Sequence, residues 1–184
     1  MAKSKSPVRS SGIFDLLGVS TDASEADRSA PQDAPAAAGA EAAGIRRIPL
    51  EHLRVDLSQP RRPLPLAYAS KVHSGALTLV QAVKHWAGDV GIELTLDIDV
   101  DDRVATGVAR ALDQLRRELA LPIFDIGLIN PITVVQSSEQ QFTIETGERR
   151  ALAHAFLVAC GHTAFGQIPA QVVERGEIAR RQFE

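Results

Sequence analysis

The chain has 184 residues and a mass of 19.7 kDa, which is room for one domain and its appendages. Its formal net charge of −3 excludes a uniformly basic coat for nucleic acid, although it leaves room for a local basic patch. A single cysteine, Cys160, excludes an intrachain disulfide and a cysteine zinc cluster, and no apolar run reaches the ~18 residues of a membrane span.

The first 44 residues are predicted to form a tail. Its start is basic, and an apolar cluster at 13–19 follows, which contains Phe14 and Leu17. From residue 20 to residue 44 the chain is rich in alanine, serine, acidic residues, glycine and proline, which bury too little surface to offset the entropy of ordering them. We therefore expect a flexible linker, with the cluster at 13–19 as a motif that docks on a partner.

The folded part is expected to begin near Ile45, with a short strand and one helical turn before the prolines at 60 and 63 exclude a regular helix. A stripe of apolar residues predicts a helix over 76–87 that ends at Gly88. Apolar and polar residues then alternate over 94–101, which predicts a strand with one acidic face. Another helix is expected from Asp102, as its N-cap, to Pro122.

The last third of the chain predicts a hairpin followed by a helix and a strand. Strands at 132–135 and around residues 142–144 flank a polar turn at 137–140. A helix is expected to run to about Cys160 and to end at Gly161, followed by a strand at 168–173 and a charged helix at 174–184. Because strands and helices mix without a regular βαβ order, the predicted fold class is α+β.

The strongest chemical signal is TGERRA at 146–151, where a predicted strand turns into a helix. Gly147 lets the backbone approach a ligand closely, and the first turn of the helix offers N–H groups without intrahelical partners. Arg149 and Arg150 beside that turn can bind phosphate oxygens. From the residues alone two readings stay open: a nucleotide phosphate site, or a glycine turn before a surface helix with solvated arginines.

Five motifs in a fixed order resemble the N-terminal domain of ParB-type partition proteins, which has the ParB/sulfiredoxin fold. The resemblance covers residues 45–62 and about 123–184. It implies a small mixed sheet with packed helices and a domain at 45–184 that binds CTP with magnesium as a clamp on DNA, in plasmid or chromosome segregation. The motifs are IPLEHLR at 48–54, QPRR at 59–62, GLINPI at 127–132, TGERRA at 146–151 and IPA at 168–170.

The resemblance also implies roles for particular residues. A phosphate-binding box matches Thr146, Gly147, Glu148, Arg149 and Arg150. Arg61, close to Gln59 in the QPRR motif, is a further residue expected to bind the nucleotide. A segment near the base and ribose matches Gly127, Leu128, Asn130 and Pro131. A glutamine linked to slow CTP hydrolysis matches Gln59, and a catalytic glutamate that holds magnesium matches Glu184.

The partners that the resemblance implies are DNA, a ParA-type ATPase and a second copy of the chain that joins it when nucleotide binds. We expect the tail to engage the ATPase through Arg9, with Phe14 and Leu17 as anchors. The location implied is the cytoplasm of a bacterium, at the nucleoid or a plasmid, with no membrane association. The helix-turn-helix region that follows in the family is missing, so the chain is expected to be truncated and to bind DNA weakly without sequence preference.

Besides the missing helix-turn-helix region, two departures from the family pattern keep alternatives open. Ala151 and Leu152 stand where the family box continues with an aromatic residue and an arginine, and a helical insertion at 63–120 interrupts the motifs. Glu148 occupies the loop in which sulfiredoxins need a cysteine, so sulfinic acid reductase activity is not expected. The alternative functions are a ParB-like nuclease, or a non-catalytic adaptor for DNA or protein whose nucleotide site has decayed.

Overall fold

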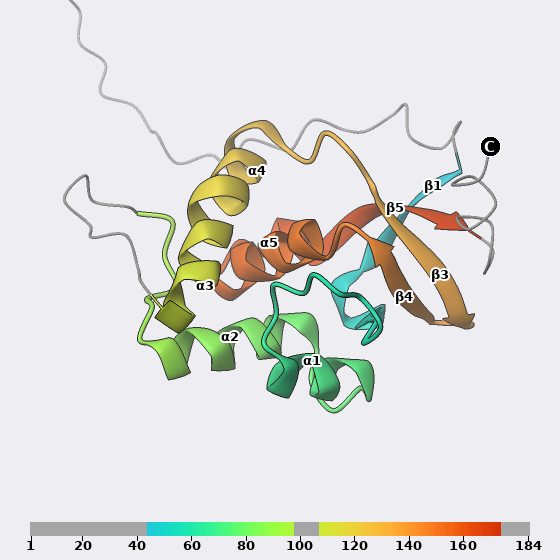
Figure 1. Cartoon of the computed structure of the whole chain (residues 1–184). Helices are drawn as coiled ribbons and strands as arrows, with labels where there is room; N and C mark the ends of the chain where they lie inside the picture. The colour runs from blue at the N-terminus through green and yellow to red at the C-terminus, as the bar shows by residue number, and fades with distance from the viewer. Residues whose placement is uncertain (1–43, 98–106, 174–184) are drawn as a thin grey trace, which may run out of the picture. The chain divides into compact units, whose positions relative to one another are not determined.

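The computed structural model describes residues 44–97 and 107–173 of the chain. Five strands form one mixed sheet in these ranges, and the helices pack together beside it (Figure 1). The predicted α+β class is therefore confirmed. The strands are β1 (Ile45–Pro49), β2 (Leu53–Val55), β3 (Ile132–Ser138), β4 (Gln141–Thr146) and β5 (Gln167–Val173).

The sheet has the order β1-β5-β3-β4-β2. Strands β3 and β4 form the antiparallel hairpin that the sequence predicts, and β5 lies parallel to β3 on its other side. The first two strands reach opposite edges: β1 pairs antiparallel with β5, and β2 pairs parallel with β4. The chain crosses from one edge to the other through the single 3₁₀ turn η2 (Leu50–His52).

The helices are α1 (Leu66–His73), α2 (Leu79–Val90), α3 (Arg110–Leu115), α4 (Leu121–Ile126) and α5 (Glu148–Ala159). Helix α5 lies at the centre, where it packs against α2 and against strands β3 and β5 (Figure 1). Its residues from 151 to 157 are all buried, because small alanines alternate with Leu152, Phe156 and Leu157. The core is thus built around α5, whose N-terminal turn carries the predicted phosphate box.

Two predicted helix ends differ from the structure. Helix α2 begins with a capping box between Thr78 and Gln81 and continues past Gly88 to Gly91, whose φ of 68° ends it. Pro122 does not end a helix: the chain passes from α3 through the π-helical turn η4 (Arg116–Ala120) into α4, with Pro122 in the first turn of α4. The proline follows directly on the wider π-helical turn, in which the N–H of Leu121 bonds to the carbonyl of Arg116.

The predicted strand at 94–101 is wrong over its described part, residues 94–97, which form no ladder. The N–H of Thr95 bonds to the carbonyl of Glu93 at 3.0 Å, and the N–H of Asp97 bonds to Oγ1 of Thr95 at 3.0 Å. These local bonds replace the partners that a neighbouring strand would supply. Residues 98–101 of that strand, the N-cap predicted at Asp102, residues 1–43 of the predicted tail and the predicted helix at 174–184 lie outside the described residues.

Candidate functional site

Gly147 begins the candidate site because it turns β4 into α5. It has a φ of 93°, and its carbonyl accepts the N–H groups of Arg150 and Ala151 at 2.9 and 3.1 Å. A Cβ placed on Gly147 would lie 2.8 Å from Cγ2 of Ile132, which is fully buried at the start of β3. Both the backbone angle and the close packing therefore require glycine at this position.

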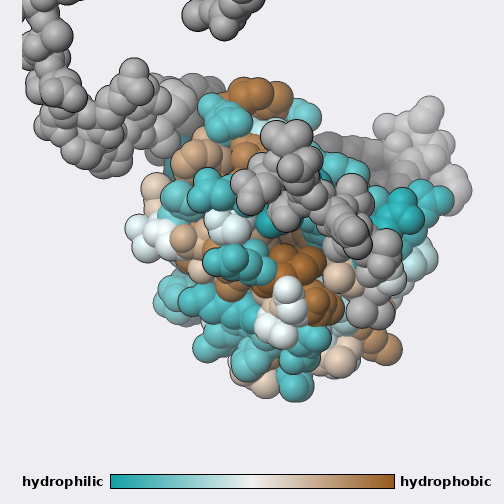
Figure 2. Space-filling model, turned by 90° about the vertical axis from the view of Figure 1, so that its left-hand side faces the viewer, coloured by the Kyte–Doolittle hydropathy of each residue, from teal (hydrophilic) through white to brown (hydrophobic). Residues whose placement is uncertain are grey.

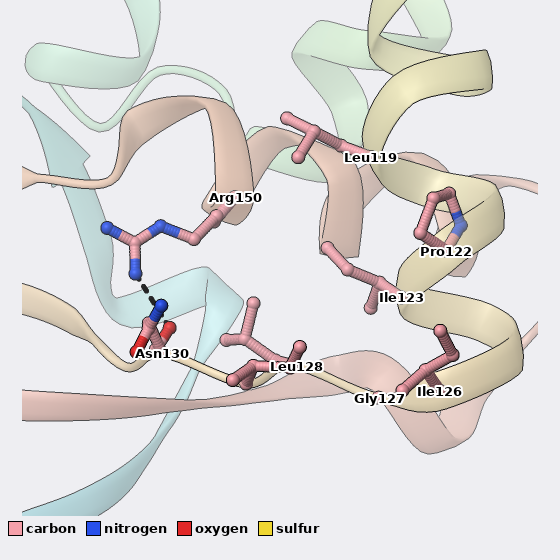
Figure 3. Close-up of a pocket in the computed structure, with 9 residues that line it drawn as sticks. Leu119, Pro122, Ile123, Ile126, Gly127, Leu128, Asn130 and Arg150 are labelled. Atoms are coloured by element: carbon pink, nitrogen blue, oxygen red, sulfur yellow. Dashed lines mark hydrogen bonds between the residues drawn. The ribbon is translucent and has the colours of Figure 1, made fainter.

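Arg150 joins the box at 146–150 to the segment at 127–131. Its Nη1 donates hydrogen bonds to the carbonyls of Asn130 and Pro131, each at 2.7 Å. The guanidinium of Arg150 points toward Asn130 across the gap between α5 and the segment at 127–131 (Figure 3). This contact fixes the course of that segment relative to the N-terminus of α5.

An open pocket lies beside this contact, with a volume of about 550 Å³ that includes its mouth. Apolar residues of η4, α4 and the segment at 127–131 supply most of its lining, and Arg150 borders it (Figure 3). The side of the molecule that carries α3 and α4 shows hydrophobic residues gathered in patches (Figure 2). At the rim Ile126 and Ile129 are 71% and 81% exposed. The lining residues are Leu119, Pro122, Ile123, Ile126, Gly127, Leu128, Ile129, Asn130 and Arg150.

Arg149 lies on the exposed side of the first turn of α5. Its Nη2 is 2.9 Å from Oε2 of Glu118, which belongs to η4, and both side chains are about half exposed, at 51% and 54%. Sequence reasoning did not identify Glu118, because 31 residues separate it from Arg149. The pair can exchange with solvent and with ligands, since exposed ion pairs contribute little stability.

Glu148, the first residue of α5, points inward rather than toward solvent. Burial raises the pKa of its carboxyl, against the opposing effects of the Arg62 charge and of the backbone N–H of Leu64, which donates to it. Its Oε1 is buried and has no hydrogen-bond partner among the described residues. Glu148 therefore connects α5 to the loop at 59–64 rather than presenting a negative charge to a ligand.

The loop that contains Gln59 is held against the same end of α5. Nε2 of Gln59 donates to the carbonyl of Glu145 at 3.0 Å, next to Thr146 at the end of β4. Nη2 of Arg62 donates to the carbonyls of Asp56, Leu57 and Gln59 at 3.2, 2.5 and 3.5 Å. Arg62 is thus the arginine that organises this loop.

The structure accordingly brings most of the predicted site residues together. Gln59, the box at 146–150 and the segment at 127–131 meet at the N-terminal end of α5. Arg61 is exposed and makes no hydrogen bond or ion pair with any residue that the structure describes. Four predicted site residues lie outside the described ranges: Arg9, Phe14, Leu17 and Glu184.

Within residues 44–97 and 107–173, no three or more His, Cys, Asp or Glu side chains are grouped so that they could hold a metal ion. None of the helices in those ranges has the length and hydrophobicity that crossing a bilayer requires. The described residues at the site therefore offer arginines, backbone N–H groups and an apolar wall, which suit an anion attached to an apolar or aromatic group.

Comparisons with known proteins found few matches. No protein-family model matches the chain, and no curated protein matches its sequence. Among solved structures, the chain is similar to the C-terminally truncated chromosome-partitioning protein ParB from Caulobacter crescentus, complexed with CTP-gamma-S. The identity is 19% and the TM-score is 0.39, over 76% of this chain and 49% of that one. The chain thus spans about half the length of the ParB chain that it matches.

Proposed function

We propose that the chain is a ParB-like partition protein that binds a nucleoside triphosphate, CTP by resemblance, as a clamp switch on DNA. The order of five motifs supports the family resemblance. The single observation that carries the proposal is that residues 127–130 and Arg150 of the box line one pocket, and that Arg150 donates hydrogen bonds to the carbonyls of Asn130 and Pro131. These are the segments that the resemblance assigns to the nucleoside and to the phosphates.

The chemistry of the site supports the same ligand class. The positive end of the α5 dipole and the half-exposed guanidinium of Arg149 would attract the phosphates. The apolar wall from Leu119 to Leu128 would take the base and ribose, since ligand pockets are mostly apolar with a few polar groups that fix orientation. A nucleotide rather than a bare anion is favoured because Arg150 lines the apolar pocket and Arg149 lies next to it in the same helical turn.

Magnesium would reach this site mainly through the phosphates of the nucleotide, with Glu184 as the protein ligand that the resemblance implies. The ion would offset phosphate charge, and this chain's residues would orient the ligand. Gln59 lies within hydrogen-bonding distance of the end of β4, beside the box, where it could orient a water molecule. Slow hydrolysis of CTP is therefore part of the proposal.

The partners are also proposed by resemblance. DNA would bind weakly and without sequence preference, because the net charge of the chain is −3. A ParA-type ATPase would bind the tail through Arg9, Phe14 and Leu17, and a second copy of the chain would close on the first when nucleotide binds. This assembly would act in the bacterial cytoplasm, at the nucleoid or a plasmid.

A second candidate function is an adaptor whose nucleotide site has decayed. The observation that favours it is that protein groups already contact both box arginines: Glu118 contacts Arg149, and two carbonyls accept bonds from Arg150. Ala151 and Leu152 are consistent with it, because both are fully buried and offer no polar group to a ligand.

Calorimetric titration with CTP, ATP, GTP and UTP in the presence of magnesium separates the two functions. We expect CTP to bind, and we expect Arg149→Ala to weaken binding at least about tenfold, because a charge-assisted hydrogen bond contributes about 1.5–3 kcal/mol. Arg110→Ala, at an exposed helical arginine outside the site, is the matched control. Absence of binding by all four nucleotides would support the adaptor, and unchanged affinity in Arg149→Ala would remove Arg149 from the site.

A further inference from the structure

The ion pair between Glu118 and Arg149 places a carboxylate where a phosphate would bind. Oε2 of Glu118 is 2.9 Å from Nη2 of Arg149, at the first turn of α5 and next to the pocket wall formed by Leu119. We propose that Glu118 is an intramolecular counter-ion that competes with phosphate-bearing ligands for Arg149 and so sets the affinity of the site. This inference rests on the proposed function, because it concerns the same site.

The turn that carries Glu118 is held in place by a buried network. Asp113 is 2% exposed, and its Oδ1 accepts from Nη2 of Arg116 at 2.9 Å and from Nε of Arg117 at 3.0 Å. These contacts fix the start of η4 at the point where it departs from α-helical geometry. Because the backbone is fixed there, the carboxylate of Glu118 stays within reach of Arg149 when the pair opens.

Arg149 rather than Arg150 is the arginine that can exchange partners. Arg150 Nη1 donates to two backbone carbonyls, which cannot move without moving the segment at 127–131. The partner of Arg149 is a side chain on the surface, and opening the pair returns two half-exposed groups to water. A ligand phosphate can therefore take Arg149 from Glu118 at small cost, while the carboxylate that is released remains nearby and repels the ligand.

Glu118 also belongs to the segment at 63–120, which lies between the motifs of the family pattern. Through this one residue and Leu119, that segment contributes both charge and wall to the site. The counter-ion is thus a feature of this chain's own insertion, and it gives the insertion a means of tuning the ligand affinity.

Calorimetric titration of the full chain with inorganic tripolyphosphate and with CTP tests the inference. Glu118→Gln removes the charge and keeps the shape, so we expect it to tighten tripolyphosphate binding about two- to fivefold, the range set by exposed ion pairs. The gain should shrink in high salt and vanish in the Arg149→Gln background. Glu139→Gln, in the turn between β3 and β4 at the far end of the hairpin, changes the net charge equally and should have no effect.

The outcomes distinguish the inference from the proposed function. If Glu118→Gln tightens tripolyphosphate but CTP binds no better than tripolyphosphate, the counter-ion stands and the nucleotide function falls. If CTP binds tightly and Glu118→Gln leaves both affinities unchanged, the function stands and the counter-ion is refuted. A gain equal to that of Glu139→Gln, or binding by neither ligand to any variant, also refutes the counter-ion.

Discussion

Replacement of Gly147 by alanine tests whether the turn before α5 depends on glycine in the way the structure implies. A residue with a Cβ at a φ of 93° costs about 1–2 kcal/mol. The added Cβ would also lie 2.8 Å from Cγ2 of Ile132, and forcing atoms into a packed core costs about 1–3 kcal/mol. Gly147→Ala should therefore lower the free energy of unfolding by about 2–5 kcal/mol, a large part of the roughly 5–15 kcal/mol that stabilises a domain.

Two other glycines separate the contributions to this loss. Gly161 has a φ of 101°, but a Cβ there would have no neighbour within 4 Å, so Gly161→Ala should cost only about 1–2 kcal/mol. Gly88 lies inside α2, also with open space around a Cβ, so Gly88→Ala should stabilise the protein by up to about 1 kcal/mol. Urea unfolding of all three variants, followed by circular dichroism, gives the free energies.

The order of the three variants in free energy of unfolding tests whether the turn requires both the backbone angle and the close packing at Gly147. If Gly147→Ala loses no more stability than Gly161→Ala, Ile132 yields to the new methyl group and the close packing is not a constraint. If its effect resembles that of Gly88→Ala, the left-handed backbone is not required either, and the account of this turn is wrong.

Three further predictions concern the site and the core. Burial raises the pKa of Glu148, so the native state holds its proton more firmly and stability should fall as pH rises above 4.5, whereas Glu148→Gln should lack this fall in urea unfolding. Burial lowers the pKa of His154, so stability should fall as pH decreases below 6.5, and His154→Gln should remove that dependence. Gln59→Ala should cost roughly 0.5–1.5 kcal/mol in the same assay, because it removes the bond to the Glu145 carbonyl, and it should leave CTP affinity within a factor of about three if the amide acts on turnover. If the difference in the free energy of unfolding between the unchanged protein and Glu148→Gln, or His154→Gln, does not depend on pH, the corresponding assignment is wrong. A collapse of CTP affinity in Gln59→Ala would contradict the role of Gln59 in turnover.

The elements around α5 could be predicted from the sequence because their limits are marked locally. Gly147 and Gly161 both have positive φ angles, and they bracket a helix whose apolar residues all face the core. In the hairpin before it, buried residues occupy alternate positions of β4, β3 is buried over most of its first half, and a two-residue turn joins the two strands. Local chemistry thus determined these elements, and tertiary contacts reinforced it.

Residues 94–97 show why the same reasoning fails elsewhere. Leu94 and Leu96 are partly buried against the core, so their alternation correctly indicates one apolar side. A strand also needs backbone partners, and here the bonds of Thr95 and Asp97 are made within the segment. Helix α1 was missed for a related reason, since its eight residues between prolines and Gly75 are too few to show a clear period.

The site itself could be predicted only as a set of segments. The residue types of the box indicated an anion site, and the resemblance implied that the segment at 127–131 lies near the base and ribose, but the contacts that organise these segments join distant positions. Gln59 and Glu145 are separated by 86 residues, and Glu118 and Arg149 by 31. The inward orientation of the Glu148 side chain could not be predicted for the same reason, because only the folded chain brings Arg62 and the N–H of Leu64 to its carboxyl.

The two adjacent arginines of the box consequently have different roles in the structure, which their sequence does not show. Arg150 is a structural residue as well as a pocket residue, since its loss would leave the carbonyls of Asn130 and Pro131 without their donor and release the pocket wall. Among the residues that the structure describes, the side chain of Arg149 has one hydrogen-bond and ion-pair partner, Glu118, so its removal changes charge without breaking a bond to the backbone. Loss of affinity in an Arg150 variant would therefore mix ligand contact with pocket geometry, whereas an Arg149 variant changes the charges at the site, its own and that of the unpaired Glu118, and leaves the pocket wall in place.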